Sequence, residues 1–255
     1  FRLYRPSSAT GQVPLVVMLH GGYGSAKQAE DSYGWDAAAD QGRFAVAFPD
    51  GVGRSWNAGT CCGPAQKKHI DDVGFITAMI AAIERQMPID RHRVFVTGMS
   101  NGAMMALRLA CETTVFAAAA PVAGTQLVDC RNARPMSVLQ IHGTADPRVP
   151  YNGGPGQGFS LRGARVDGPS IPSVNAFWRT TDHCRPPTTT TRTPVTTSTA
   201  RCPDGKAVQL ISIAGAGHQW PGSAAHPVLE RTLGADPPST ALHATQVIWQ
   251  FFATR

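Results

Sequence analysis

Residues 93–111 read Arg-Val-Phe-Val-Thr-Gly-Met-Ser-Asn-Gly-Ala-Met-Met-Ala-Leu-Arg-Leu-Ala-Cys, and the rest of the chain is organised around this stretch. The residues up to Thr97 predict a short buried strand, whereas those after Gly102 are strong helix formers. Between them lies a G-x-S-x-G pentapeptide. A strand that turns into a helix this sharply needs small residues on both sides, and it leaves Ser100 exposed at the positive end of the helix. We therefore predict a nucleophile elbow; the alternative is a turn whose serine only caps the helix.

Length and composition indicate one globular α/β domain over residues 1–255, long enough to bury both faces of a sheet. The chain is 42% hydrophobic and 16% charged, and its net charge of +6 comes from scattered basic residues. Nucleic acid is therefore not an expected partner. No apolar run is long enough for a transmembrane segment. The chain begins at Phe1 rather than Met, which fits removal of a precursor segment.

Six cysteines in a chain of this size favour an oxidising compartment, so we expect a secreted protein or one anchored on the outer face of the cell envelope. The candidate disulfide pairs are Cys184 with Cys202 and Cys111 with Cys130. The neighbours Cys61 and Cys62 either form a disulfide with each other or do not bond to each other. A bridge around the Thr/Pro-rich stretch between Cys184 and Cys202 would stabilise the fold by about 3 kcal/mol. No C-x-x-C pair occurs, so no metal site is expected.

A glycine-rich loop follows the first strong strand signal. Residues 13–19 are almost continuously apolar, as in a parallel strand buried on both faces, and they lead into His20-Gly21-Gly22-Tyr23-Gly24. We predict that the N–H groups of Gly22 and Asn101 form an oxyanion hole. The alternative is an ordinary strand-to-helix loop. His20 is expected to brace this loop rather than to take part in catalysis.

Three aromatic residues beside these motifs, Tyr23, Trp56 and Trp220, are candidate substrate contacts. Trp56 lies in the irregular polar stretch 54–63, and such loops often carry recognition. The alternative for Trp56 is that it fixes this loop onto the core.

Other segments have ordinary structural interpretations. Asp71-Asp72 precede an amphipathic helix that ends at Pro88, and capping explains them better than acid–base or metal chemistry. The Thr-rich stretch 186–199 and residues 208–213 predict a hairpin at the sheet edge. A final helix is expected over 239–253, with Ser239 as its cap.

Two further candidates follow predicted strands. Asp146 lies just beyond the strand 137–141, where open α/β sheets keep functional groups, although an Asp-Pro turn is also common for local reasons. His218 lies on a glycine-flanked loop after the strand 208–213. The order Ser100, Asp146, His218 is that of nucleophile, acid and base in α/β-hydrolases. His218 would take the proton of Ser100, and Asp146 would stabilise the imidazolium.

Six motifs together resemble one family: His20-Gly21-Gly22, Trp56-Asn57-Ala58-Gly59, Asp71-Asp72-Val73-Gly74-Phe75, Gly98-Met99-Ser100-Asn101-Gly102, His142-Gly143-Thr144-Ala145-Asp146 and Gly217-His218-Gln219-Trp220-Pro221-Gly222. They look like the polyhydroxybutyrate-depolymerase-like esterases, related to feruloyl and acetylxylan esterases of carbohydrate esterase family one. The resemblance covers residues 13 to about 253. It implies an α/β-hydrolase fold, a mostly parallel sheet with helices on both faces, and a secreted serine esterase that needs no cofactor, with Ser100, Asp146 and His218 as its triad.

The resemblance leaves the substrate open, because the family spans polyesters and aryl or acetyl esters of polysaccharides. A depolymerase of solid polymer usually adds a linker and a binding domain, which this chain lacks. We therefore expect a small-molecule or oligomeric ester, and esters derived from a polysaccharide or a polyester are the candidates. Two alternatives remain: acyl transfer to a sugar or lipid alcohol, and a non-catalytic, polymer-binding relic of the fold.

Overall fold

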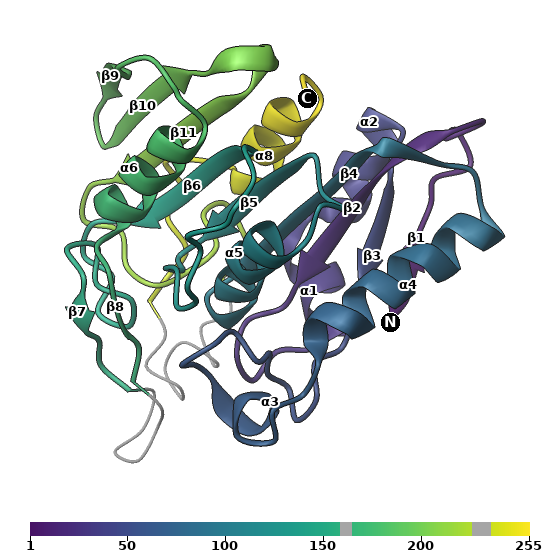
Figure 1. The fold of residues 1–255 in the computed structure, drawn as a ribbon, viewed down its shortest axis with the longest axis horizontal. Coiled ribbons are helices and arrows are strands. Elements are labelled where there is room, and N and C mark those ends of the chain that lie inside the picture. Colours follow the sequence, from purple (N-terminus) through teal and green to yellow (C-terminus); the bar gives the residue numbers. More distant parts are fainter. Residues whose placement is uncertain (159–164, 226–235) are drawn as a thin grey trace.

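The computed structural model describes residues 1–158, 165–225 and 236–255, and its centre is a twisted sheet with helices on both faces (Figure 1). In the described residues the strand order is β1-β3-β2-β4-β5-β6-β11-β10-β9. The strands are β1 Arg2–Tyr4, β2 Val13–Leu19, β3 Ala45–Phe48, β4 Ile89–Met99, β5 Ala118–Val122, β6 Ser137–Gly143, β9 Thr188–Arg192, β10 Val195–Arg201 and β11 Ala207–Ile213. The six from β3 to β11 in this order are parallel. At one end of the sheet β1 pairs antiparallel with β3, and at the other β10 pairs antiparallel with both β11 and the edge strand β9. A separate small ladder joins β7 Gly154–Pro155 to β8 Asp167–Gly168.

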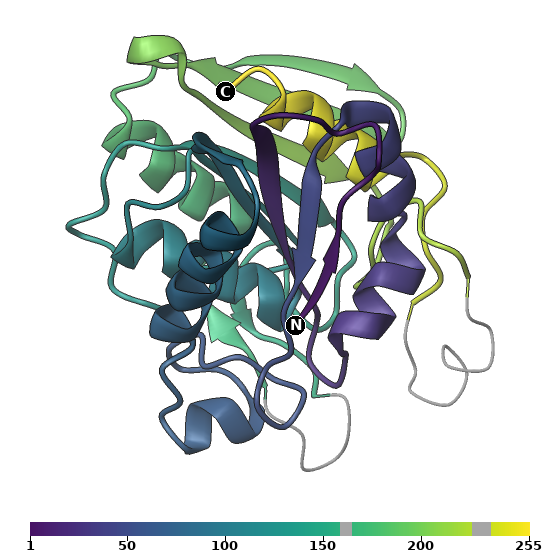
Figure 2. The same cartoon turned by 90° about the vertical axis from the view of Figure 1, so that its right-hand side faces the viewer.

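Two hydrophobic clusters lie on opposite faces of the sheet. Along β2, residues 15, 17 and 19 belong to one cluster, and residues 16 and 18 belong to the other, as expected for a strand buried on both sides. The helices of the first face are α4 Asp72–Gln86, α5 Asn101–Glu112 and α6 Ile171–Thr181, and those of the second are α1 Ala26–Tyr33, α2 Trp35–Gly42 and α8 Ala244–Phe252. Figure 2 shows the two groups on either side of the strands. The mostly parallel α/β-hydrolase architecture expected from the sequence is confirmed.

The two neighbouring aspartates have different structural roles. Asp71 caps α4 by accepting a hydrogen bond from the N–H of Gly74 at 2.9 Å, which confirms the capping interpretation. Asp72 is 1% exposed and accepts the N–H of Asn57 at 2.7 Å, so it anchors the 54–63 loop to the start of α4. Burial raises the pKa of Asp72, and the hydrogen bond from Asn57 and the nearby charge of Arg108 oppose that rise.

The Thr-rich stretch differs in one respect from the prediction. β10 pairs with β11 as expected, but the stretch forms two strands, because residues 193 and 194 make a tight turn that leads β9 back along β10. Proline cannot donate a ladder hydrogen bond, so Pro194 favours a turn at this point. All five residues of β9 are exposed.

The final helix begins later than predicted. α8 starts at Ala244 after the N-cap residue His243, so the prediction that Ser239 caps it is wrong. Instead, Ser239 lies in the preceding loop, where its carbonyl accepts the N–H of Gly222 at 2.9 Å. The intervening residues are therefore used to fasten the loop that carries His218.

All six cysteines are paired: Cys61 with Cys62, Cys111 with Cys130, and Cys184 with Cys202. The two separated pairs agree with the sequence prediction, and the neighbouring cysteines bond to each other. Within the described ranges, no helix has the length and apolar character needed to cross a bilayer.

Candidate active site

The predicted turn between β4 and α5 is present, with Ser100 at its tip. Ser100 has φ 55° and ψ −116°, a backbone conformation that non-glycine residues rarely adopt. A Cβ at Gly98 would lie 2.5 Å from the backbone of Gly102, and one at Gly102 would lie 2.3 Å from the carbonyl oxygen of Leu19. Both glycines are therefore needed for β2, β4 and α5 to approach this closely.

Three side chains from distant parts of the chain form one hydrogen-bonded row. The Oγ of Ser100 lies 2.8 Å from Nε2 of His218, and Nδ1 of His218 lies 2.8 Å from Oδ2 of Asp146. A carboxylate can only accept, so Nδ1 carries a proton and Nε2 accepts the hydroxyl proton of Ser100. This is the arrangement in which an imidazole can remove a proton from a serine.

The row forms because the strands that carry these residues are near neighbours in the sheet and run in the same direction. Ser100 directly follows β4, whereas the other two side chains lie on the loops after β6 and β11. Those two loops are tied together, since the N–H of Ala145 donates to the carbonyl of Ala216 at 3.0 Å. A Cβ at Gly143 would lie 2.2 Å from that same carbonyl oxygen, so only glycine permits this approach. The side chains of Asp146 and His218 are thus held together at one edge of the sheet.

The carboxylate of Asp146 is fully buried and surrounded by donors. Its Oδ1 accepts the N–H groups of Arg148 and Val149, each at 2.8 Å. Its Oδ2 accepts Nδ1 of His218 and lies 3.2 Å from Nε2 of His142. Burial alone would raise the pKa of this carboxyl, but the charge of His218 and the hydrogen bonds from both histidines outweigh burial and hold the pKa well below its usual range. Asp146 therefore stays ionised.

The glycine-rich loop lies against the elbow. A Cβ at Gly21 would lie 3.8 Å from Cβ of Ser100, and one at Gly22 would lie 3.9 Å from Cβ of Asn101. Asn101 begins α5, where the first N–H groups have no partner within the helix. The two predicted oxyanion donors, Gly22 and Asn101, are therefore on adjoining segments beside Ser100. Their role stays a prediction.

His20 braces this loop, as predicted. Its ring is fully buried, with Nδ1 2.7 Å from the carbonyl of Gly21 and Nε2 accepting the N–H of Gly51 at 3.0 Å. Since Nε2 accepts, Nδ1 carries the proton and donates to Gly21. Burial lowers the pKa of His20, which favours the neutral ring that these two bonds require.

The prediction that Trp56 forms a wall of the substrate pocket is wrong. Trp56 is fully buried in the core, and its indole N–H donates to the carbonyl of His20 at 2.9 Å. Its backbone N–H and carbonyl bond to the side-chain amide of Asn101 at 2.7 and 2.9 Å. The alternative interpretation holds: Trp56 fixes its loop onto the core, and it links that loop to the elbow and to the glycine-rich loop.

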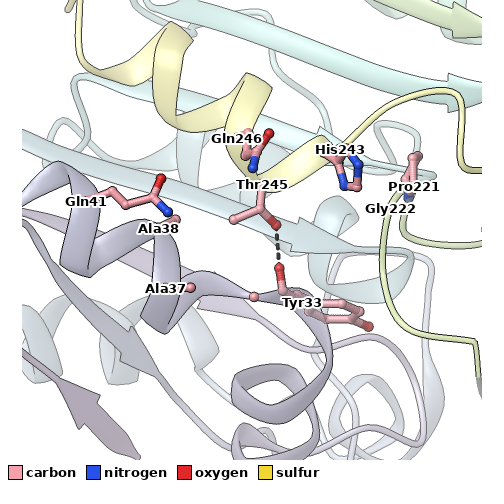
Figure 3. Close-up of a pocket in the computed structure, with 11 residues that line it drawn as sticks. Tyr33, Ala37, Ala38, Gln41, Pro221, Gly222, His243, Thr245 and Gln246 are labelled. Carbon is pink, nitrogen blue, oxygen red and sulfur yellow. Dashed lines mark hydrogen bonds between the residues drawn. The ribbon is translucent and has the colours of Figure 1, made fainter.

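Trp220 is also a structural residue rather than a substrate contact. It is 2% exposed, it stacks on Tyr33 with ring centroids 4.6 Å apart, and its N–H donates to Thr245 at 3.1 Å. Thr245 in turn donates to the carbonyl of Tyr33, as Figure 3 shows. A pocket of about 210 Å³ is lined by Tyr33, Thr245 and Pro221, among other residues. Figure 3 shows this pocket. The three residues of the hydrogen-bonded row do not line this pocket. The loop after His218 is therefore anchored to the start of α8.

Tyr23 remains a candidate substrate contact. Its side chain is 60% exposed, and its backbone has φ 65°. The N–H of Tyr23 donates to the carbonyl of Arg54 at 2.9 Å, which fixes the backbone next to Gly22. An aromatic ring on the surface beside the elbow is placed to contact a substrate, so this prediction stands untested.

Sequence reasoning missed several residues that support the site. Asp236 accepts the backbone N–H of His218 at 2.6 Å, and its carboxylate would lie 2.2 Å from a Cβ at Gly217. The side chain of Asn101 and the imidazole of His142 also had no assigned role. The contacts of Asp236 with His218 and of Asn101 with Trp56 join segments whose proximity depends on the fold, so no local signal identifies them. The contact of His142 with Asp146 is local, because the two residues are four positions apart.

Among the residues that the structure describes, one group has the composition of a metal site: Asp182, Cys184 and Cys202. Both sulfurs are joined in a disulfide, so neither is available as a thiolate ligand.

Comparison with known proteins adds a second kind of evidence. A family model described as "Esterase PHB depolymerase" matches residues 1–152. "Putative esterase NocK" of Nocardia uniformis subsp. tsuyamanensis is 34% identical over 233 residues, which cover 82% of this chain and 66% of that protein. "Feruloyl esterase B" of Piromyces equi is 38% identical over 162 residues, which cover 58% of this chain and 29% of that protein. The chain thus spans less than two thirds of either relative.

Among solved structures, an acetyl xylan esterase from Aspergillus awamori has a TM-score of 0.67 at 16% identity, covering 99% of this chain and 93% of that one. At this identity the likeness establishes the fold alone. It agrees with the α/β-hydrolase architecture derived above.

Proposed function

The chain belongs to the PHB depolymerase esterase family, and on that premise we propose that residues 1–255 form one serine esterase domain that hydrolyses carboxylic esters. The observation that carries the proposal is the row in which Nε2 of His218 lies 2.8 Å from Ser100 and Nδ1 lies 2.8 Å from Asp146. A serine–imidazole–carboxylate row is the arrangement that activates a hydroxyl as a nucleophile.

In the proposed reaction Ser100 attacks the ester carbonyl while His218 takes its proton. The imidazolium then gives this proton to the departing alcohol, and water resolves the acyl-enzyme in a second, equivalent cycle. Asp146 holds the imidazole in the Nδ1–H tautomer and stabilises its charge. The N–H groups of Gly22 and Asn101 stabilise the oxyanion, with each such donor contributing on the order of 10² to 10³ in rate.

We propose ester-linked small molecules or oligomers as substrates. The names of the relatives point to two acyl groups, feruloyl and acetyl, and the family model points to hydroxyalkanoate esters. The exposed ring of Tyr23 beside Gly22 would suit a flat aryl group or a sugar ring. Three disulfides further support an oxidising compartment outside the cytosol.

Replacing Ser100 by Ala tests the proposal directly. We expect the variant to lose hydrolysis of p-nitrophenyl acetate and labelling by a fluorophosphonate, while Ser198→Ala, on β10 at the far side of the sheet, keeps both. A Ser100→Ala chain with wild-type turnover would rule out the proposed nucleophile. A panel of acetyl, butyryl, hydroxybutyryl and feruloyl esters then identifies the preferred acyl group.

The non-catalytic alternative gains no support from the site, and an assay separates acyl transfer from hydrolysis. A non-catalytic relic would require the serine, imidazole and carboxylate to lie apart, and they lie within hydrogen-bonding distance of one another. Acyl transfer would appear in the same assay as a transesterified product when a sugar or lipid alcohol is added.

A further inference from the structure

We propose that His142 is a positioning residue for this reaction, because its imidazole N–H holds the Asp146 carboxylate in the orientation that receives His218. The inference rests on the proposed function, since it concerns the same row of side chains. It concerns a residue that neither abstracts a proton nor touches the reacting atoms.

The geometry determines which atom of His142 carries the proton. His142 is the penultimate residue of β6, and its side chain is 1% exposed. Its Nε2 lies 2.8 Å from the carbonyl oxygen of Val149 and 3.2 Å from Oδ2 of Asp146. A carbonyl and an ionised carboxylate only accept, so Nε2 must carry a hydrogen that both oxygens share.

The Nε2–H of His142 matters because the other hydrogen bonds to the Asp146 carboxylate hold mainly its Oδ1 atom. Two backbone N–H groups hold Oδ1 of Asp146. They do not by themselves prevent a rotation of the carboxylate that displaces Oδ2. Oδ2 is the oxygen that bonds to His218, and His142 is the second donor directed at it. Removal of the N–H would let Oδ2 move away from the line to Nδ1 of His218.

Because Asp146 is buried, loss of the His142 N–H donor should lower the reaction rate. The side chain of Asp146 is 0% exposed, so solvent does not replace a missing donor. A misplacement of about 1 Å at such a contact can lower a rate by about 10²-fold. The effect should appear in kcat rather than KM, because Asp146 acts on the imidazolium that forms during the reaction and not on bound substrate.

The test compares side chains that differ in one N–H group. Gln places an amide N–H at nearly the distance of Nε2 from the backbone, Met has the same length without a donor, and Asn reaches only as far as Nδ1. For p-nitrophenyl acetate we expect His142→Met and His142→Asn to lower kcat by about 10- to 100-fold with KM changed by less than about twofold. We expect His142→Gln to recover kcat to within about fivefold of wild type.

Two further measurements separate positioning from packing. Tyr151→Phe removes a 2.7 Å hydrogen bond to Ser212 near the His142 ring without touching Asp146, and it should leave kcat unchanged. The downfield proton NMR signal of the His218 Nδ1–H should shift in the Met variant and stay near its wild-type position in the Gln variant. Thermal unfolding confirms that each variant is folded, and if either the Met or the Asn variant does not fold, the other takes its place.

The inference is overturned if a folded Met or Asn variant keeps wild-type kcat, if Gln performs no better than Met, or if KM changes instead of kcat. Failure of the proposed function itself would look different, because wild type and Ser100→Ala would then have equal activity whatever residue stands at 142.

Discussion

Gly102→Ala should reduce activity far more than it reduces stability. A Cβ at this position would lie 2.3 Å from the carbonyl oxygen of Leu19 and 2.5 Å from that of His20. These distances are about 1 Å short of an ordinary carbon contact, and the obstructing atoms are backbone. α5 must therefore move by about 1 Å relative to the glycine-rich loop, and Ser100 moves with it.

The expected magnitudes follow from this displacement. Overpacking typically costs about 1 to 3 kcal/mol, whereas the better helix propensity of Ala returns up to about 1 kcal/mol, so the net loss of stability is roughly 0 to 2 kcal/mol. A shift of about 1 Å between Ser100 and Gly22, the predicted oxyanion donor on the glycine-rich loop, should lower kcat/KM by about 10²-fold. Hydrolysis of p-nitrophenyl acetate and urea unfolding measure the two effects.

Gly42→Ala is the matched control. A Cβ there would lie 2.4 Å from the indole of Trp249, a clash of nearly the same size at the end of α2 and away from Ser100. It should lower stability by about 1 to 3 kcal/mol and leave kcat/KM unchanged. The reasoning is refuted if Gly102→Ala keeps kcat/KM within about threefold of wild type, or if Gly42→Ala loses as much activity.

Three further predictions concern polar contacts. Asn101→Ala removes the acceptor for the backbone N–H of Trp56 and leaves the Trp56 carbonyl with only the 3.3 Å bond from the N–H of Cys62. It should lower the free energy of unfolding by about 1 to 3 kcal/mol, measured by urea titration; no change would show that the loop is held by other contacts. Asp236→Ala removes the acceptor for the N–H of His218 and should lower kcat about tenfold in the p-nitrophenyl acetate assay, whereas Asp236→Asn, which keeps an acceptor, should not; equal rates in the two would contradict this. Burial raises the pKa of Asp182 from 3.8 to about 6, so its proton stabilises the fold below pH 3.8 and this stabilisation is lost as the pH rises to about 6. The free energy of unfolding of Asp182→Asn, relative to that of wild type, should therefore rise by about 2 to 3 kcal/mol between pH 4 and pH 7, as measured by chemical unfolding. If the difference between the two proteins were constant over that range, the shifted pKa would be wrong.

The strand and loop order around Ser100, Asp146 and His218 could be predicted from the sequence because each signal is local. A β-branched run, a glycine turn and a polar residue past the strand end suffice to place each side chain at the same edge of a parallel sheet. The catalytic roles of these side chains remain to be tested.

Contacts between distant loops could not be predicted in this way. Trp56 and Trp220 stand beside site motifs, and that proximity favoured substrate contacts, yet each indole N–H found a buried acceptor, His20 O and Thr245 Oγ respectively. Amphipathic rings are ambiguous in a sequence, since they serve a pocket or a core equally well. The acceptor that shows the ring to be part of the core lies 36 residues from Trp56 in one case and 25 residues from Trp220 in the other.

The β9–β10 hairpin has a practical consequence for use of the protein on solid supports. Its turn at residues 193–194 lies on the edge strand farthest along the sheet from β4, and every side chain of β9 faces solvent. Exposed turns of this kind tolerate added sequence. An immobilisation tag or a grafted polymer-binding module inserted there would lie at the opposite end of the sheet order from β4, so we expect the protein to be tethered without blocking access to Ser100.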